Sequence, residues 1–177
     1  MASLDQKTFV KLRRLYIIAL SLIAVSVFVS QFLVQNFLDD QATDSRVINI
    51  AGRQRMLSQK LTKEAIQLKY PDSKFALRAL QDSLAQTRNL WYVSHKALQQ
   101  GSDFLQIPHI ASDTIVALYE KINPFFNQIL DASSTLIRPS QNTSQSNAEM
   151  DSAIQTIQNN EGAFLKWMDQ IVDQYEL

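Results

Sequence analysis

The residues best suited to binding a ligand lie in one short stretch, VINIAGRQRMLSQKL, at residues 47–61. Arg55 carries a permanent cation with a planar fork of donors, which suits a small oxyanion. A glycine inside a helix costs about 1 kcal/mol relative to alanine, so Gly52 needs a packing reason. Residues three, four and seven apart share one helix face. This face would therefore carry Ile48, Gly52, Arg55 and Gln59, extended by Thr62 and Ile66.

A glycine on such a face lets another backbone approach closely, and two-fold homodimers are the commonest oligomers. We therefore predict that this face meets the same helix of a second protomer, which would bring two Arg55 side chains together. Two guanidinium groups repel, and a small anion between them would accept hydrogen bonds from both. Ligand binding would then favour one of two helix packings. The competing interpretation is an ordinary exposed arginine on a polar helix.

Arg53 points to a different side of the predicted helix. Its stripe is expected to be a solvated face, with Arg46, Asn49, Lys60 and Glu64.

Other chemistry is poorly represented. The chain has no cysteine, and its acidic and basic residues balance at 17 each, which gives no argument for nucleic-acid binding. The carboxylates Asp151, Glu161, Asp169 and Asp173 are scattered and do not form a di-metal pattern. We expect no enzymatic activity, catalytic residue, metal site or cofactor. The two histidines, His95 and His109, are interpreted as helix-surface or capping residues.

An uncharged, mostly apolar run at residues 15–38 precedes this stretch. As a helix it would be about 36 Å long, and a bilayer core needs about 30 Å. Basic residues precede the run and acidic residues follow it, so the N-terminus should be cytoplasmic. A cleavable signal peptide is the alternative, but no convincing small-x-small cleavage site is present. We predict a cytoplasmic tail at residues 1–14, a transmembrane helix at 15–38 in the inner membrane and an extracytoplasmic domain at 39–177.

The domain should be all-α. Four helical stretches with apolar residues at helical spacing are expected at about residues 39–68, 73–99, 109–137 and 148–177. Pro71 separates the first two, with Asp72 or Ser73 as a cap, and Gly101 should end the second. Pro124 should kink or break the third, and a polar loop should occupy residues 140–147. Trp91, Trp167, Phe125 and Phe126 are assigned to the core rather than to a ligand cage.

Long helices with short connections predict an antiparallel up-down-up-down four-helix bundle preceded by one transmembrane helix. The last helix would then return toward the membrane. We expect a second span and a cytoplasmic output domain, or a partner that supplies them, beyond this chain.

The segment INIAGRQRMLSQKL resembles the motif that opens the N-terminal sensor domain of type IV pilus methyl-accepting chemotaxis transducers. The pattern I-N-x-A-G-x-x-R-M-x-S is matched at every specified position, and weaker resemblance continues through LWYVSHKALQQG at residues 90–101. That family is related to the periplasmic domains of nitrate/nitrite sensor kinases. The resemblance implies a dimeric four-helix sensor, and Arg55 would correspond to the anion-binding arginine of the nitrate sensors.

The sequence departs from the nitrate-sensor form at Arg53 and Gln54, where those sensors carry smaller or apolar residues. The resemblance therefore implies the fold more strongly than it implies nitrate. Two functions follow as hypotheses. The first is a ligand-sensing domain of a bacterial transmembrane receptor, either a chemotaxis transducer or a sensor histidine kinase. The second is a ligand-free structural or protein-interaction bundle anchored in the membrane.

Overall fold

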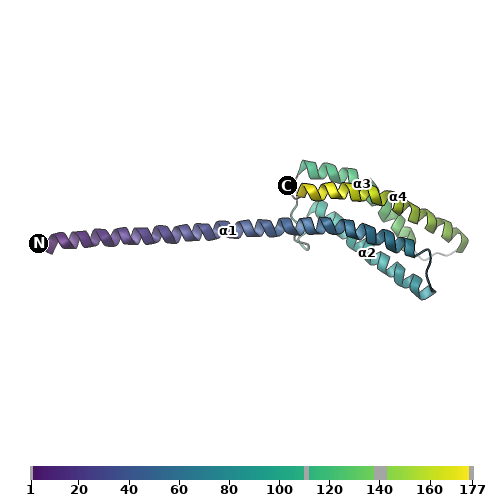
Figure 1. The fold of residues 1–177 in the computed structure, drawn as a ribbon, viewed down its shortest axis with the longest axis horizontal. Coiled ribbons are helices and arrows are strands. Elements are labelled where there is room, and N and C mark those ends of the chain that lie inside the picture. The colour runs from purple at the N-terminus through teal and green to yellow at the C-terminus, as the bar shows by residue number, and fades with distance from the viewer. Residues whose placement is uncertain (1, 110–111, 138–142, 176–177) are drawn as a thin grey trace. The chain divides into compact units, whose positions relative to one another are not determined.

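The chain forms four helices in a computed structural model that describes residues 2–109, 112–137 and 143–175. They are α1 (Ala2–Gln67), α2 (Lys74–Gln100), α3 (Asp113–Ile137) and α4 (Thr143–Tyr175) (Figure 1). Over the described residues there is no strand, apart from one isolated bridge between Ser102 and Ile107. The prediction of an all-helical protein is confirmed for this part of the chain.

The chain divides into two compact units, at residues 1–42 and 43–177, and α1 is continuous across the division. In the first unit every described side chain from Thr8 to Leu38 is exposed, although most are apolar. An exposed apolar surface of this extent is typical of a segment that contacts membrane lipid or another protein. Among the described residues, α1 is the one helix that is long and apolar enough to cross a membrane, judged by length and composition.

The second unit has a single core built from all four helices. The segment expected to be helical at residues 39–68 contributes an apolar stripe to this core. Its buried members are Val47, Ala51, Leu57, Leu61 and Ala65 on α1 and Leu68 just after it. The largest fully buried side chains from the other helices include Trp91, Phe126 and Phe164. The ring of Trp91 lies 4.4 Å from that of Phe126 and 4.9 Å from that of Phe164, measured between centroids. Trp167 and Phe125 are only half-buried at the edge of this core.

Two ion pairs show how the α1 segment and α4 are oriented, because a later residue of the first segment contacts an earlier residue of the second. Arg55 pairs with Asp169, and Lys69, just after α1, pairs with Asp151. The same trend joins α2 to α3, because Gln81 donates to the carbonyl of Leu136 whereas Gln99 donates to Asn123. Both pairs of helices are therefore antiparallel.

The predicted breaks between α1, α2 and the following loop are confirmed. Ser73 caps α2 with its hydroxyl oxygen, which accepts from the amide of Ala76 at 3.1 Å. Gly101 follows α2 with φ = 77°. A side chain there would be strained, and its Cβ would lie 3.0 Å from the amide nitrogen of His109.

Two predicted boundaries of the later helices are wrong. α3 begins at Asp113 rather than at His109. α4 begins at Thr143, so residues 143–147 are helical instead of forming a loop. No proline or glycine lies between residues 140 and 147, so nothing prevents the helix from starting early. Of the predicted kink or break at Pro124, the break is absent, because α3 continues through this residue. The remaining residues of that predicted loop lie outside the described part of the chain.

Candidate functional site

The face of α1 singled out by the sequence is only partly covered by the rest of the chain. Ile48 and Gly52 are half-buried, and Gln59 and Ile66 are exposed. Beyond its chain neighbours and the nearby backbone of α1, a Cβ atom added to Gly52 would find no described atom within 4 Å. The notch at Gly52 is therefore open and is not filled by the chain's own helices.

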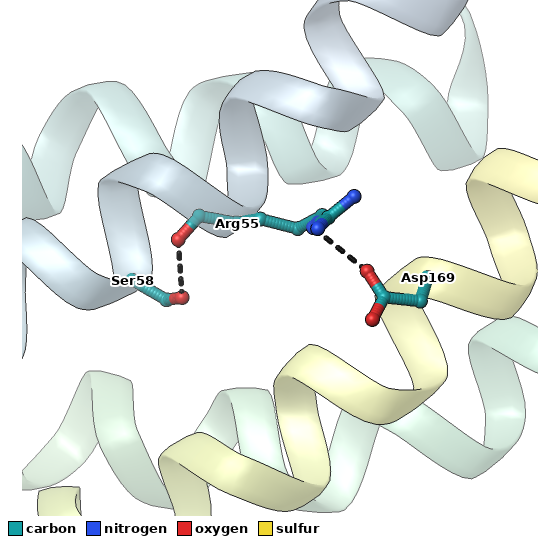
Figure 2. A network of polar contacts seen from close by, with 3 residues as sticks. All are labelled: Arg55, Ser58 and Asp169. Carbon is teal, nitrogen blue, oxygen red and sulfur yellow. Dashed lines mark hydrogen bonds and ion pairs between the residues drawn. The ribbon is translucent and has the colours of Figure 1, made fainter.

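Arg55 has a partner that the sequence did not reveal. Its Nε lies 2.7 Å from Oδ1 of Asp169 on α4, and both side chains remain 48% exposed. Figure 2 shows the guanidinium reaching from α1 to α4, with one nitrogen pointing away from the carboxylate. The hydroxyl of Ser58 donates to the carbonyl of Arg55 at 2.9 Å, one turn along the helix. Arg55 is thus neither buried nor an isolated cation.

The pairing changes the electrostatics of the site. We predicted that two Arg55 side chains would repel until an anion bound between them. Asp169 already supplies one negative charge to each guanidinium, so that repulsion is largely neutralised within the subunit. Oδ1 of Asp169 is buried and makes no hydrogen bond beyond this ion pair. Asp169 was interpreted as one of several scattered carboxylates, and it is instead the counter-ion of the candidate ligand-binding arginine.

The end of the predicted face turns toward α4. Thr62 is buried, and its hydroxyl donates to the carbonyl of Ser58 at 3.0 Å. Burial raises the pKa of Glu161 on α4, and the neighbouring Thr62 side chain partly opposes this rise. Arg55 and Thr62 therefore line the seam between α1 and α4, whereas Gly52 and Gln59 remain open.

The face assigned to solvent is exposed in its middle but not at its two ends, and at the first end Arg46 is half-buried and donates to the side-chain oxygen of Gln106. Arg53, Asn49 and Lys60 are exposed. Glu64 is buried, and its carboxylate accepts from the hydroxyl of Ser83 at 2.6 Å. The prediction that Glu64 is solvated is wrong, because α2 covers this turn of α1.

A group of buried polar side chains lies inside the bundle and was missed by the sequence reasoning. Gln54 is fully buried, and neither its amide nitrogen nor its amide oxygen has a partner. The hydroxyl of Thr87 and the indole nitrogen of Trp91 are likewise buried without a partner. A signal was present, because Gln54 lies three positions after Ala51 and three before Leu57, on the apolar stripe.

His95 belongs to the same interior, so its assignment to the helix surface is wrong. It is fully buried, its Nε2 lies 3.2 Å from Oδ1 of Asn123, and Nδ1 has no partner. Burial lowers the pKa of His95 to about 4, because the charged ring loses its hydration. The bond to Asn123 opposes this shift, and the nearby Lys96 charge adds to it. His95 is a neutral core residue at pH 7, whereas His109 is exposed.

Elsewhere on the described surface, one groove suits an anion less well than Arg55 does, and no cluster of metal ligands is found. This open groove, between α3 and α4, is lined mainly by small side chains and by the acidic residues Asp131 and Glu149. Its negative charge disfavours anions. Over the described ranges, no group of three His, Asp or Glu side chains could hold a metal ion.

The fold and the site define a class of protein: a helical bundle whose first helix includes a candidate membrane span and whose surface carries a half-exposed arginine. The family comparison is more specific. The chain belongs to the family of type IV pili methyl-accepting chemotaxis transducer N-terminal domains, whose model matches residues 37–160. This is a signalling family, so a sensor role at the inner membrane fits the candidate membrane helix. Arg55 lies inside the matched range and Asp169 lies beyond it. No curated protein and no solved structure matches the chain.

Proposed function

We propose that this chain is the ligand-sensing part of a membrane receptor, with an anion site on α1. The observation that carries the proposal is the open notch at Gly52 one turn from the half-exposed guanidinium of Arg55. Both residues lie on the same helix as the candidate membrane span. A change in the packing of this helix could therefore be transmitted along it. In this arrangement the bundle is up-down-up-down and extracytoplasmic, and the N-terminus is cytoplasmic.

The partner across the notch is a second copy of the chain. Exposed apolar side chains follow the notch along α1, with Met56 one turn beyond Gly52 at 48% relative exposure and Ile66 further along at 39%. The glycine allows two helices to approach closely about a two-fold axis. The two Arg55 guanidinium groups then face a shared space at the interface, and their free donors suit a planar oxyanion such as nitrate or nitrite.

The anion acts by differential binding. It favours the packing in which both guanidinium groups point into the interface, over the packing in which they do not. Ile48 and Gln59, one turn to either side of the Gly52 and Arg55 pair, would line the same interface.

The full chain in detergent micelles tests the proposal. Its thermal unfolding is followed by the fluorescence of Trp91 and Trp167, which both lie in the second unit. Nitrate and nitrite replace chloride at constant ionic strength. We expect either anion to raise the Tm of the wild type and of Arg53→Ala, but not of Arg55→Ala. Arg53 is the matched control, because it is an exposed arginine of the same helix on another face. Failure of both anions to raise the wild-type Tm, or an equal rise in Arg55→Ala, would sink the anion site.

The ion pair itself favours a second function. Because Arg55 already has Asp169 as a counter-ion, the face around Gly52 could serve only to pair this bundle with another membrane protein. A dimer whose self-association is unchanged by any anion, and by Arg55→Ala, would favour this ligand-free interaction module.

A further inference from the structure

We propose that Asp169 is an internal competitor that sets the affinity and the output of the anion site at Arg55. This inference depends on the proposed function, since it concerns the same guanidinium. Ligand binding is then an exchange in which Arg55 leaves the carboxylate of its own α4 and takes the anion.

The geometry supports an exchange rather than simple addition. The carboxylate of Asp169 lies 2.7 Å from Nε, so it occupies one side of the guanidinium. No other acceptor contacts the Arg55 side chain within the described residues, and half of its surface is open. An anion can therefore approach from the free side before the ion pair breaks (Figure 2).

The charges then decide which arrangement persists. A bound anion and Asp169 would both lie within a few ångströms of one guanidinium, and like charges at such distances repel strongly outside bulk water. In a dimer with two Arg55 and two Asp169 side chains, the site has no net charge before the ligand arrives. A single anion therefore gains little attraction unless at least one carboxylate moves away. Asp169 lowers the affinity and makes binding depend on movement.

The movement is local to the seam between α1 and α4. Among the described residues, Thr62 also lies beside Glu161 and Lys69 pairs with Asp151 along this seam, and neither contact involves Arg55. Release of Asp169 would therefore loosen the Arg55 end of the seam while the other contacts persist. The exchange converts the arrival of an anion into a change in spacing between the first and last helices of the bundle.

Titration of the full chain in detergent with sodium nitrate, at constant ionic strength, tests the competition. We expect Asp169→Asn to bind nitrate about tenfold more tightly than the wild type, the size expected for removal of one nearby charge. Asp151→Asn is the matched control. Like Asp169, Asp151 is a half-exposed carboxylate of α4 that forms an ion pair, in this case with Lys69 just after α1. Asp151→Asn should bind nitrate within about twofold of the wild type.

The two proposals fail in different ways. If Asp169→Asn binds nitrate no more tightly than the wild type while Arg55→Ala does not bind, the anion site stands and the competitor is overturned. Weaker binding by Asp169→Asn would make the carboxylate a group that positions Arg55. If neither the wild type nor Asp169→Asn binds nitrate or nitrite, the proposed function falls and the competitor falls with it.

A distance measurement tests the exchange without relying on affinity. The chain has no cysteine, so cysteines placed at Lys63 and Gln170 can be spin-labelled selectively. Both positions are exposed, one on α1 and one on α4. With labelled chain diluted into unlabelled chain, we expect nitrate to shift the wild-type distance toward that of ligand-free Asp169→Asn. An unchanged distance on saturation with nitrate, or no difference between the two ligand-free proteins, would overturn the exchange.

Discussion

The imidazole of His95 lies flat against the ring of Phe126, with centroids 3.8 Å apart and planes 12° apart. Three other aromatic rings surround it: Trp91, Tyr119 and Phe164. This environment replaces water around the ring with apolar surface, so the neutral form is favoured.

Acid should therefore destabilise the bundle through His95. Its pKa is about 4 in the folded chain, below the ordinary value of 6.5. The unfolded chain thus binds this proton first, and the stability present above pH 6.5 is lost as the pH falls toward about 4. The difference corresponds to about 3 kcal/mol.

Denaturant unfolding of the wild type and of His95→Leu, followed by tryptophan fluorescence between neutral pH and pH about 4, measures this contribution. The wild type should lose more stability than the variant. The comparison cancels other groups, including Glu161, whose raised pKa acts in the opposite direction. Parallel pH profiles would contradict a buried, neutral His95.

Gln54 should cost stability, because its amide is buried with both polar atoms unpaired. Gln54→Leu keeps a similar volume and removes both atoms. We expect the free energy of unfolding to rise by about 1–3 kcal/mol. Gln59→Leu is the control, since Gln59 is exposed on the same helix and should change stability by less than about 0.5 kcal/mol. A loss of stability in Gln54→Leu would mean that the amide has a bound partner.

The carboxylate of Glu64 should depend on Ser83 more than on Lys60. The Ser83 hydroxyl donates to it at 2.6 Å, whereas Nζ of Lys60 lies 3.6 Å away on a half-exposed side chain. Ser83→Ala should cost about 1–3 kcal/mol, because it removes the hydrogen bond to a buried carboxylate and leaves only the longer contact with Lys60. Lys60→Ala should cost less than about 1 kcal/mol. Equal losses in denaturant unfolding would show that the salt bridge matters as much as the hydrogen bond.

Gly52 and Gly162 offer a matched test of the dimer. Apart from chain neighbours and the nearby backbone of the same helix, no described atom lies within 4 Å of a Cβ added at either site, so alanine fits both within one chain. Each substitution should stabilise its helix by about 1 kcal/mol. Only Gly52→Ala should weaken self-association, because only Gly52 lies in the proposed interface. Sedimentation of the full chain in detergent measures this, and equal association of the two variants would place the interface elsewhere.

Much of the fold was determined by sequence periodicity. The α1 stripe from Val47 to Leu68, the Ser73 cap and the Gly101 terminus follow from local rules: apolar spacing, side-chain capping and a positive φ. The run at residues 15–38 is equally predictable from sequence, since its length and apolar composition make it a candidate membrane span. The motif around Gly52 and Arg55 was visible for the same reason, as a local pattern.

Only the tertiary structure decided which residues meet across helices. Asp169 lies far along the chain from Arg55, and no local pattern shows that α4 brings its carboxylate to that guanidinium. Gln54, Glu64 and His95 are polar residues whose burial depends on which neighbouring helix covers each turn. Local periodicity fixes the face of a helix on which a residue lies, whereas the rotation and register between packed helices fix what that residue touches.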